Sequence, residues 1–289
     1  MSCKVKPAKQ SRMEPINLKE VIRKKNPKLA KKLPGFVIWI LGKIIHLKEI
    51  NKILEKYGDL KGLDFANGCL EYLNVKNNAV ILHPEKFVEG EKYVFVSNHP
   101  LGGLDGLIIT TELSKRFGPS KFLVNDILMN LEPLQELFVP VNNLGTAGGK
   151  QVRGVMDLYN SDYNVLNFPA GACSRLIKGK IQDLEWKKSF VRQATNSGRC
   201  IVPMHFKGKN SGLFYWSSKI RMALGIKSFI EMILLPHEMF RQKNKTFLLT
   251  VGDPITPEEI NASGESTQQW CDRIRKIVYS YGESNSGNR

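Results

Sequence analysis

Apolar and polar positions follow one another along the chain in blocks that favour strands and helices in turn. Short apolar runs typical of strands occupy 78–84, 93–98, 121–125, 139–143, 163–175, 200–208 and 245–255, and the first two read as buried. Segments with helical apolar spacing lie at 50–75, 104–118, 126–138 (with a proline kink), 147–161, 185–198, 215–242 (in pieces) and 257–281. Strands that alternate with helices predict an α/β fold with a largely parallel central sheet flanked by helices.

A basic arm and an apolar run precede this pattern. Residues 1–35 hold eleven Lys and Arg against two Glu; a mobile arm is expected over 1–32, with a helix starting near Leu18 as one option. The run at 33–50 is too short to span a bilayer, which needs about 20 apolar residues. It could be a buried core helix, or it could lie in a membrane interface with Trp39 at the headgroups. The neighbouring arm favours the second, an N-terminal helical membrane-associating extension.

Charge and cysteine content narrow the class of partner. The 289 residues carry a net charge of +16, which favours a nucleic acid, an anionic membrane or a phosphorylated ligand. No nucleic-acid recognition motif is present and the charge adjoins an apolar helix, so we expect no nucleic-acid partner. Five scattered cysteines without a CxxC spacing favour a reducing compartment, with no disulfide framework and no metal site. The N-terminus lacks a secretory signal pattern.

The stretch "SNHPLGGLDG", residues 97–106, is the first candidate for chemistry. It follows the strand "YVFV", and ligands of open α/β sheets bind at the carboxyl ends of strands. Gly102 and Gly103 would let the loop turn back until Asp105 orients His99 as a general base. The alternative is a helix-capping turn in which Asp105 faces the helix dipole and His99 is incidental.

Two further strands end in chemically suggestive turns. "LNFPAGACSR", residues 166–175, offers backbone N–H groups and Arg175 to an oxyanion or phosphate, although an ordinary turn with a surface arginine, or a reactive Cys173, are alternatives. "VPMHFKGKNSGLFYW", residues 202–216, could line a pocket for an anionic headgroup. Aromatic residues at this density are more often core, and His205 within a strand is more often structural.

Together these motifs resemble the glycerolipid and lysophospholipid acyltransferase superfamily. "NHPLGGLDG", "FPAGACSR" and "IVPMHFKG" follow in the order of its His–Asp, F-P-E-G-T-R-S-like and V-P elements. "DLEW" at 183–186 and "GKNSGLFY" at 208–215 are similar to the hemolysin-like branch, some members of which make ornithine or glycine lipids. The resemblance covers roughly residues 75–255.

The sequence departs from the superfamily pattern at three places. Five residues, rather than four, separate His99 from Asp105. Ala170 stands where most members have Glu, and "PVNN" at 140–143 replaces the arginine that often follows the second block. The last two departures argue against a standard glycerol-3-phosphate-type acceptor.

The resemblance implies a mechanism and a set of site residues. His99 would take the proton of an acceptor hydroxyl, Asp105 would orient it, and the hydroxyl would attack the thioester of acyl-CoA or acyl carrier protein without metal, cofactor or covalent enzyme intermediate. The substrate-binding residues would be Asn98, Gly102, Gly103, Phe168, Pro169, Gly171, Ser174, Arg175, Lys207, Lys209 and Asn210.

The implied function is a membrane-associated O-acyltransferase that acylates a lyso-lipid, above all lyso-ornithine or lyso-glycine lipid. A 1-acylglycerol-3-phosphate acyltransferase and a non-catalytic membrane-binding protein on the same scaffold are the alternatives. The expected place is the cytoplasmic face of the cell membrane, as a peripheral or monotopic protein on an anionic surface. The expected parts are a basic arm (1–35), interfacial and amphipathic helices (36–75), an acyltransferase domain (76–256) and a C-terminal helix and tail (257–289).

Overall fold

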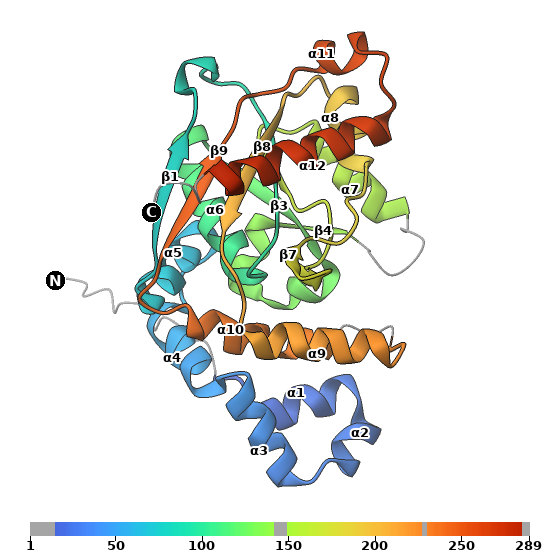
Figure 1. The fold of residues 1–289 in the computed structure, drawn as a ribbon. Coiled ribbons are helices and arrows are strands. Elements are labelled where there is room, and N and C mark those ends of the chain that lie inside the picture. The colour runs from blue at the N-terminus through green and yellow to red at the C-terminus, as the bar shows by residue number, and fades with distance from the viewer. Residues whose placement is uncertain (1–14, 142–148, 227–229, 285–289) are drawn as a thin grey trace, which may run out of the picture.

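A seven-stranded sheet forms the centre of the molecule, seen here in a computed structural model that describes residues 15–141, 149–226 and 230–284 (Figure 1). The strand order is β1-β9-β8-β2-β5-β3-β4, and every neighbouring pair is parallel except β8 and β9. The strands are β1 (Lys76–Ile81), β2 (Val94–Ser97), β3 (Ser120–Asn125), β4 (Phe138–Val141), β5 (Asn164–Asn167), β8 (Ile201–Lys207) and β9 (Thr246–Val251). The predicted α/β fold with a largely parallel sheet is confirmed.

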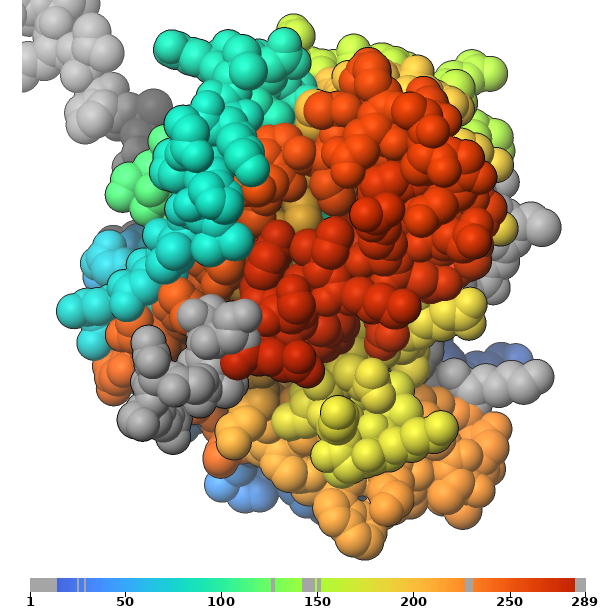
Figure 2. Space-filling view, turned by 45° about the horizontal axis from the view of Figure 1, so that its top comes forward, coloured from blue at the N-terminus to red at the C-terminus, as the bar shows by residue number. Residues whose placement is uncertain are grey.

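Helices cover both faces of the sheet, and the central strand β2 shows why. All four of its residues are buried; Phe95 packs into one core, whereas Val94 and Val96 pack into the other. The first core is closed by α4 (Leu47–Tyr57), α5 (Gly62–Leu73) and α6 (Gly103–Phe117). The second is closed by α7 (Gly149–Tyr159), α8 (Ser189–Asn196), α11 (Pro257–Ala262) and α12 (Thr267–Ser284). Figure 2 shows the red C-terminal segment spread across this second face.

The N-terminal extension consists of short helices that stand away from the sheet (Figure 1). They are α1 (Leu18–Lys25), α2 (Pro27–Lys32) and α3 (Gly35–Ile44). Residues 1–14 of the predicted mobile arm lie outside the described residues. The core-helix alternative for the apolar run is wrong, because α3 has no buried residue and Phe36 and Trp39 are 66% and 60% exposed. Among the described residues, no helix has the length and apolarity to cross a membrane.

Three local predictions differ from the structure. The strand at 78–84 is β1, whose residues alternate between exposed and half-buried because it lies at the sheet edge. Segment 126–138 forms two 3₁₀ helices, η2 (Asp126–Asn130) and η3 (Glu132–Leu137), since Pro133 cannot donate a helical hydrogen bond. The C-terminal helix is two helices, α11 and α12, divided where Gly264 has φ +71°.

The remaining predicted segments are close to their observed bounds where the structure describes them. Within 163–175 the strand, β5, gives way to the predicted glycine turn after Asn167, and residues 142–143 and 147–148 of two predicted elements lie outside the described residues. Segment 50–75 overlaps α4 and α5, which are separated at residues 58–61. Segment 215–242 overlaps α9 (Gly212–Ala223) and contains η4 (Ile230–Leu234) and α10 (Leu235–Arg241). A small antiparallel hairpin, β6 (Arg175–Ile177) with β7 (Lys180–Gln182), was not predicted, and a short η1 (Pro84–Lys86) follows β1. Because β8, β2, β5, β3 and β4 run parallel, their carboxyl ends meet at one edge of the sheet.

Candidate active site

The loop between β2 and α6 brings the predicted histidine and aspartate together. Gly102, the residue before α6, has φ +78°, and a Cβ there would lie 3.0 Å from the Cys173 sulfur. Glycine is therefore needed both for the backbone conformation and for the space. Asp105 lies in the first turn of α6, and its Oδ2 accepts a 2.8 Å hydrogen bond from the Leu101 N–H. This turn accommodates the extra residue between His99 and Asp105.

The side chains of His99 and Asp105 lie in contact. The Nδ1 of His99 is 2.9 Å from the Oδ1 of Asp105; the aspartate side chain is fully buried and that of the histidine is 17% exposed. The two atoms are close, but the angle between the ring and the carboxylate is not that of a well-aligned hydrogen bond. With Nδ1 held by the carboxylate, Nε2 is the ring nitrogen left for a substrate proton.

The surroundings of His99 raise its pKa above the ordinary 6.5. Burial, the largest influence, lowers the pKa, but the charge of Asp105, contact with it and the charge of Asp183 together outweigh burial. Asp183 is itself buried, and burial raises its pKa despite bonds from Ser174 and Trp186. A histidine paired in this way holds its tautomer and stabilises its imidazolium, as a general base must.

Segment 168–186 fixes the histidine from a second side. The His99 ring stacks on Phe168 with ring centres 4.0 Å apart. The His99 N–H donates to Asp183 at 3.2 Å, and the His99 carbonyl accepts from the Ser174 N–H at 2.8 Å. Asp183 also accepts from the Ser174 hydroxyl at 2.6 Å and from Trp186 Nε1 at 2.9 Å. The "FPAGACSR" and "DLEW" motifs therefore hold His99 in place.

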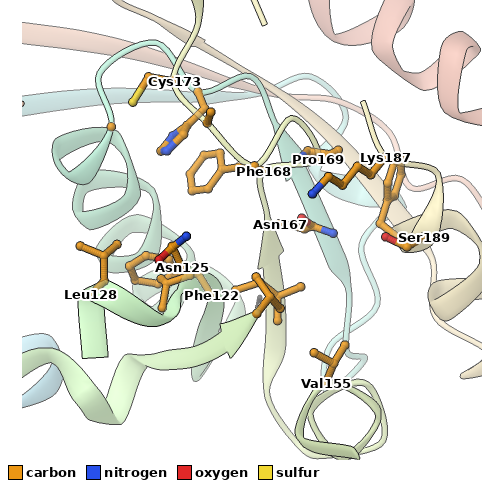
Figure 3. A pocket seen from close by; sticks show the side chains of 18 of the residues that line it. Phe122, Asn125, Leu128, Val155, Asn167, Phe168, Pro169, Cys173, Lys187 and Ser189 are labelled. Atoms are coloured by element: carbon orange, nitrogen blue, oxygen red, sulfur yellow. The ribbon is translucent and has the colours of Figure 1, made fainter. Parts of the chain in front are cut away.

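A cavity of about 460 Å³ opens beside His99 (Figure 3). Its walls come from the carboxyl ends of β3, β4 and β5 and from α7, α8, η4 and α10. Most of the lining is apolar, and it includes Phe122, Leu128, Val141, Val152, Val155 and Met232. A largely apolar cavity with His99 at its wall suits a substrate with a long hydrocarbon chain.

Six of the predicted site residues line this cavity and seven do not. The lining ones are His99, Gly102, Gly103, Phe168, Pro169 and Gly171. Those set back from it are Asn98, Asp105, Ser174, Arg175, Lys207, Lys209 and Asn210. Asp105 does not line the cavity, but it lies 2.9 Å from His99, which does.

Arg175 differs most from expectation. It was expected to offer its guanidinium to an anion, yet its side chain is 1% exposed and donates to Glu231 at 2.8 Å and to the Cys173 carbonyl at 2.6 Å. The other oxygen of Glu231 is 2.9 Å from Arg221. This buried ion cluster ties the turn after β5 to η4.

Asn98 and Asn210 have structural partners. The Asn98 amide exchanges two hydrogen bonds with the backbone of Phe206, at 2.7 and 3.0 Å, and so joins the end of β2 to β8. Asn210 donates to the Pro100 carbonyl at 3.0 Å and so contacts the loop between β2 and α6. Lys207 and Lys209 are exposed on the β8 side, beyond the cavity.

Cys173 and His205, the other two residues that the sequence analysis considered for chemistry, have structural surroundings. Cys173 is 4% exposed and burial raises its pKa to about 12, so the thiolate that a reactive cysteine needs is not formed near neutral pH. His205 packs against Tyr279 of α12, and burial together with Lys207 lowers its pKa to about 4.

Comparison with known proteins decides what this constellation belongs to. Residues 20–287 match the sequence profile of a family described as acyltransferase. The chain belongs to this acyltransferase family. It is 41% identical over 265 residues to the lyso-glycine lipid O-acyltransferase of Bacteroides thetaiotaomicron, covering 91% of this chain and 96% of that protein. It is 40% identical to the protein of the same name from Phocaeicola vulgatus, covering 91% and 94%.

A solved structure is also similar to this acyltransferase. The 1-acyl-sn-glycerophosphate acyltransferase of Thermotoga maritima matches 92% of this chain and 85% of its own, with 15% identity and a TM-score of 0.48. At this score the correspondence is too loose to transfer any feature of the site. The predicted membership of an acyltransferase family, and of an enzyme rather than a binding module, is confirmed by the sequence relatives.

The acyltransferase cavity contains polar residues that sequence reasoning missed. Lys187, Ser189, Arg192 and Gln193 line it from the start of α8, together with Asn125 and Asn167 at the ends of β3 and β5. A signal was present in "EWKKSFVR", because cations at the start of a helix oppose the helix dipole and need another reason.

Proposed function

We propose that this acyltransferase moves an acyl group from a thioester donor, acyl carrier protein or CoA, to the hydroxyl of a lyso-glycine lipid. The observation that carries the proposal is the identity of 41% and 40%, over nine-tenths of the chain, to two proteins named for that activity. The apolar cavity beside His99 supports a substrate with a long acyl chain.

In the proposed reaction the acceptor hydroxyl attacks the thioester carbonyl while His99 Nε2 takes its proton. A carbon–oxygen bond forms, the carbon–sulfur bond breaks, and the histidine returns the proton to the leaving thiolate. Asp105, 2.9 Å from Nδ1, stabilises the imidazolium between the two proton transfers. The proposal needs no resident cofactor, since the thioester supplies the activated acyl group.

The test is acylation by the purified enzyme with one acceptor at a time. Lyso-glycine lipid, lyso-ornithine lipid and 1-acylglycerol-3-phosphate are each offered with labelled acyl carrier protein or CoA thioester. We expect the highest kcat/KM with lyso-glycine lipid, and loss of turnover in His99→Ala without loss of folding. A higher kcat/KM with either other acceptor, or full activity in His99→Ala, would overturn the proposal.

We also propose that the N-terminal helices hold the enzyme on the cytoplasmic face of an anionic membrane. Phe36 and Trp39 of α3 are exposed, and the Lys43 ammonium lies 3.8 Å from the Trp39 ring centre. An exposed tryptophan beside cations suits the headgroup region. Basic side chains near an anionic surface contribute about 1 kcal/mol each, and α1 and α2 display several.

Vesicle sedimentation tests this placement. Trp39→Glu should release the protein from vesicles that contain anionic lipid and leave kcat on a detergent-dispersed acceptor unchanged. Val88→Glu is the matched control, because Val88 is 63% exposed but lies outside the extension. Equal sedimentation of both variants would refute a role for α3.

A further inference from the structure

Helix α9 displays a stripe of exposed apolar side chains. Successive members are three, four and four residues apart, which places them along one face of the helix. They are 58%, 65%, 46% and 69% exposed, respectively: Leu213, Trp216, Ile220 and Leu224, which follows the last residue of α9. Other positions of the helix, such as Phe214, are buried and hold it to the protein. An apolar stripe of this kind on the surface marks an interaction site.

The exposed charges of the segments around the stripe are all positive. The hairpin of β6 and β7 lies against α9, and the end of β8 leads into it. Among the described residues of 175–182 and 207–234, no Asp or Glu is exposed, because Glu231 is buried between two arginines. The exposed lysines of these segments are Lys178, Lys180, Lys207, Lys209 and Lys219. An apolar stripe flanked by cations complements an anionic lipid surface.

The segment η4 connects the stripe with the cavity beside His99. It contacts α9, and its Met232 lines the cavity while it is also 39% exposed. Ile233, the next residue, is 51% exposed. Apolar side chains therefore lead from α9 across η4 to the wall of the cavity. A hydrocarbon chain that moves from a bilayer into the cavity along these side chains stays out of water.

A second copy of the chain is a poorer partner for this surface. Two copies that met through α9 would bring the lysines of one against those of the other, and like charges across an interface repel. A membrane fits better with the position of the helix. In Figure 1, α9 runs along the end of the molecule from which α1, α2 and α3 project. The helices α3 and α9 can therefore contact the same bilayer.

We propose that α9 and η4 form a second membrane-docking surface, whose partner is a bilayer that contains anionic lipid. The stripe enters the boundary between headgroups and acyl chains, and the lysines contact the headgroups. Docking in this way opens the cavity at the membrane, where a lyso-lipid acceptor resides. The inference rests on the proposed function for the lipid nature of the acceptor, but it uses no residue of the N-terminal extension.

Quenching of tryptophan fluorescence by brominated acyl chains tests the contact directly. The chain has four tryptophans, and in Trp39→Phe only Trp216 keeps an exposed side chain, because Trp186 and Trp270 are 2% and 1% exposed. Vesicles of brominated phosphatidylglycerol and phosphatidylcholine should quench the Trp216 emission. The control combines Trp39→Phe with Trp216→Phe, and its remaining emission should be unaffected by the vesicles.

Vesicle sedimentation measures what the stripe contributes to binding. Trp216→Glu should lower the partition coefficient for unbrominated vesicles of the same composition roughly tenfold, because a large apolar side chain is lost from the contact. Val88→Glu is the matched control and should bind like wild type, since Val88 is 63% exposed but lies outside α9, η4 and the extension. A melting curve for each variant should show an intact fold.

Four outcomes would overturn the inference. Unquenched Trp216 emission, where wild type sediments with vesicles, shows that α9 faces away from the bilayer. Equal partition of Trp216→Glu and Val88→Glu shows that the stripe contributes nothing. A dimer in sedimentation velocity that Trp216→Glu abolishes assigns the surface to a second copy. Absence of wild-type binding refutes this surface together with the proposed role of α3. None of these measurements contains acceptor or thioester, so failure of the proposed acyl transfer is a separate result.

Discussion

Replacing Asp105 with asparagine tests the central pair of the site with almost no change of shape. The Leu101 N–H donates to Oδ2 at 2.8 Å and needs an acceptor there, so the amide oxygen of the asparagine should take that place. The amide NH₂ then faces His99 Nδ1, which was 2.9 Å from the lost carboxylate oxygen. Nδ1 must now accept a hydrogen bond, and the ring proton moves to Nε2. The nitrogen that should act as base is blocked.

The expected loss follows from this change of tautomer. General-base assistance contributes about 10²–10⁴-fold to a rate, so kcat/KM should fall by that factor. This corresponds to roughly 3–5 kcal/mol of transition-state stabilisation. Folding should change little, because the asparagine keeps the bond to the Leu101 N–H.

The pH dependence of kcat/KM gives a second, independent test of the His99–Asp105 pair. The base works when it is neutral, and the pKa of His99 is raised above 6.5, so wild-type kcat/KM should fall as the pH drops through a value above 6.5. Burial lowers the pKa of His99 and the charge of Asp105 raises it, so removal of that charge in Asp105→Asn should lower the pKa of His99. The acid limb of the residual activity should therefore move to lower pH.

The assay is kcat/KM for acyl transfer from pH 5 to 9 with a saturating thioester donor. Asp253→Asn is the matched control: its carboxylate lies 2.6 Å from His83 Nδ1 in an exposed pair away from the cavity. That variant should keep the wild-type profile. A loss below about tenfold in Asp105→Asn, or an acid limb that stays in place, would refute the reasoning.

Three further predictions concern the frame of the site. Gly102→Ala should lower the free energy of unfolding by about 2–4 kcal/mol, because φ at Gly102 is +78° and the new Cβ would lie 3.0 Å from the Cys173 sulfur. Gly103→Ala is the control and should leave this free energy unchanged, because a Cβ at Gly103 meets open space within a helix. Equal denaturant unfolding curves for the two variants would contradict this reasoning. Glu231→Gln should lower the free energy of unfolding by about 3–5 kcal/mol in the same denaturant assay, because the two buried arginines Arg175 and Arg221 lose the carboxylate they pair with. A decrease below about 1 kcal/mol would mean that the cluster contributes no more than a surface ion pair. His46 contacts His237 at 2.9 Å, and burial together with the charge of His237 lowers the pKa of His46 in the folded protein. The unfolded chain therefore binds a proton more readily at this site, and the folded protein loses stability as the pH falls below 6.5. Between pH 7 and pH 5 the melting temperature of His46→Asn should therefore fall less than that of wild type.

The sequence predicted the features that depend on residues close together along the chain. The parallel sheet follows from alternating patterns, and the His99–Asp105 pair follows from its place after a buried strand. Burial and pairing that depend on residues far away in the sequence could not be predicted. The run at 78–84 looked like a buried strand, and only its pairing with β9 puts it at an edge. Arg175 looked like an anion-binding group because its partner, Glu231, lies 56 positions further on.

The missed polar wall has a similar cause. Lys187 lies just before α8 and Arg192 lies within it, and the pattern of this segment is that of any surface helix. The two residues line the cavity only because the segment packs beside the turn after β5. Segment 126–138 shows the opposite failure. Its apolar spacing suits a helix, but Pro133 removes a donor and the segment divides into two 3₁₀ pieces.

The position of β1 has a consequence for synthesis of the protein. In the described sheet β1 pairs with β9 alone, and Thr246 leaves the ribosome 170 residues after Lys76. At 5–20 residues per second this delay lasts roughly 10–30 s. During that time the nascent chain presents an unpaired strand, in addition to the exposed apolar residues of α3. Chaperone capacity during translation, more than the stability of the finished fold, should therefore limit the yield of active enzyme in a foreign host.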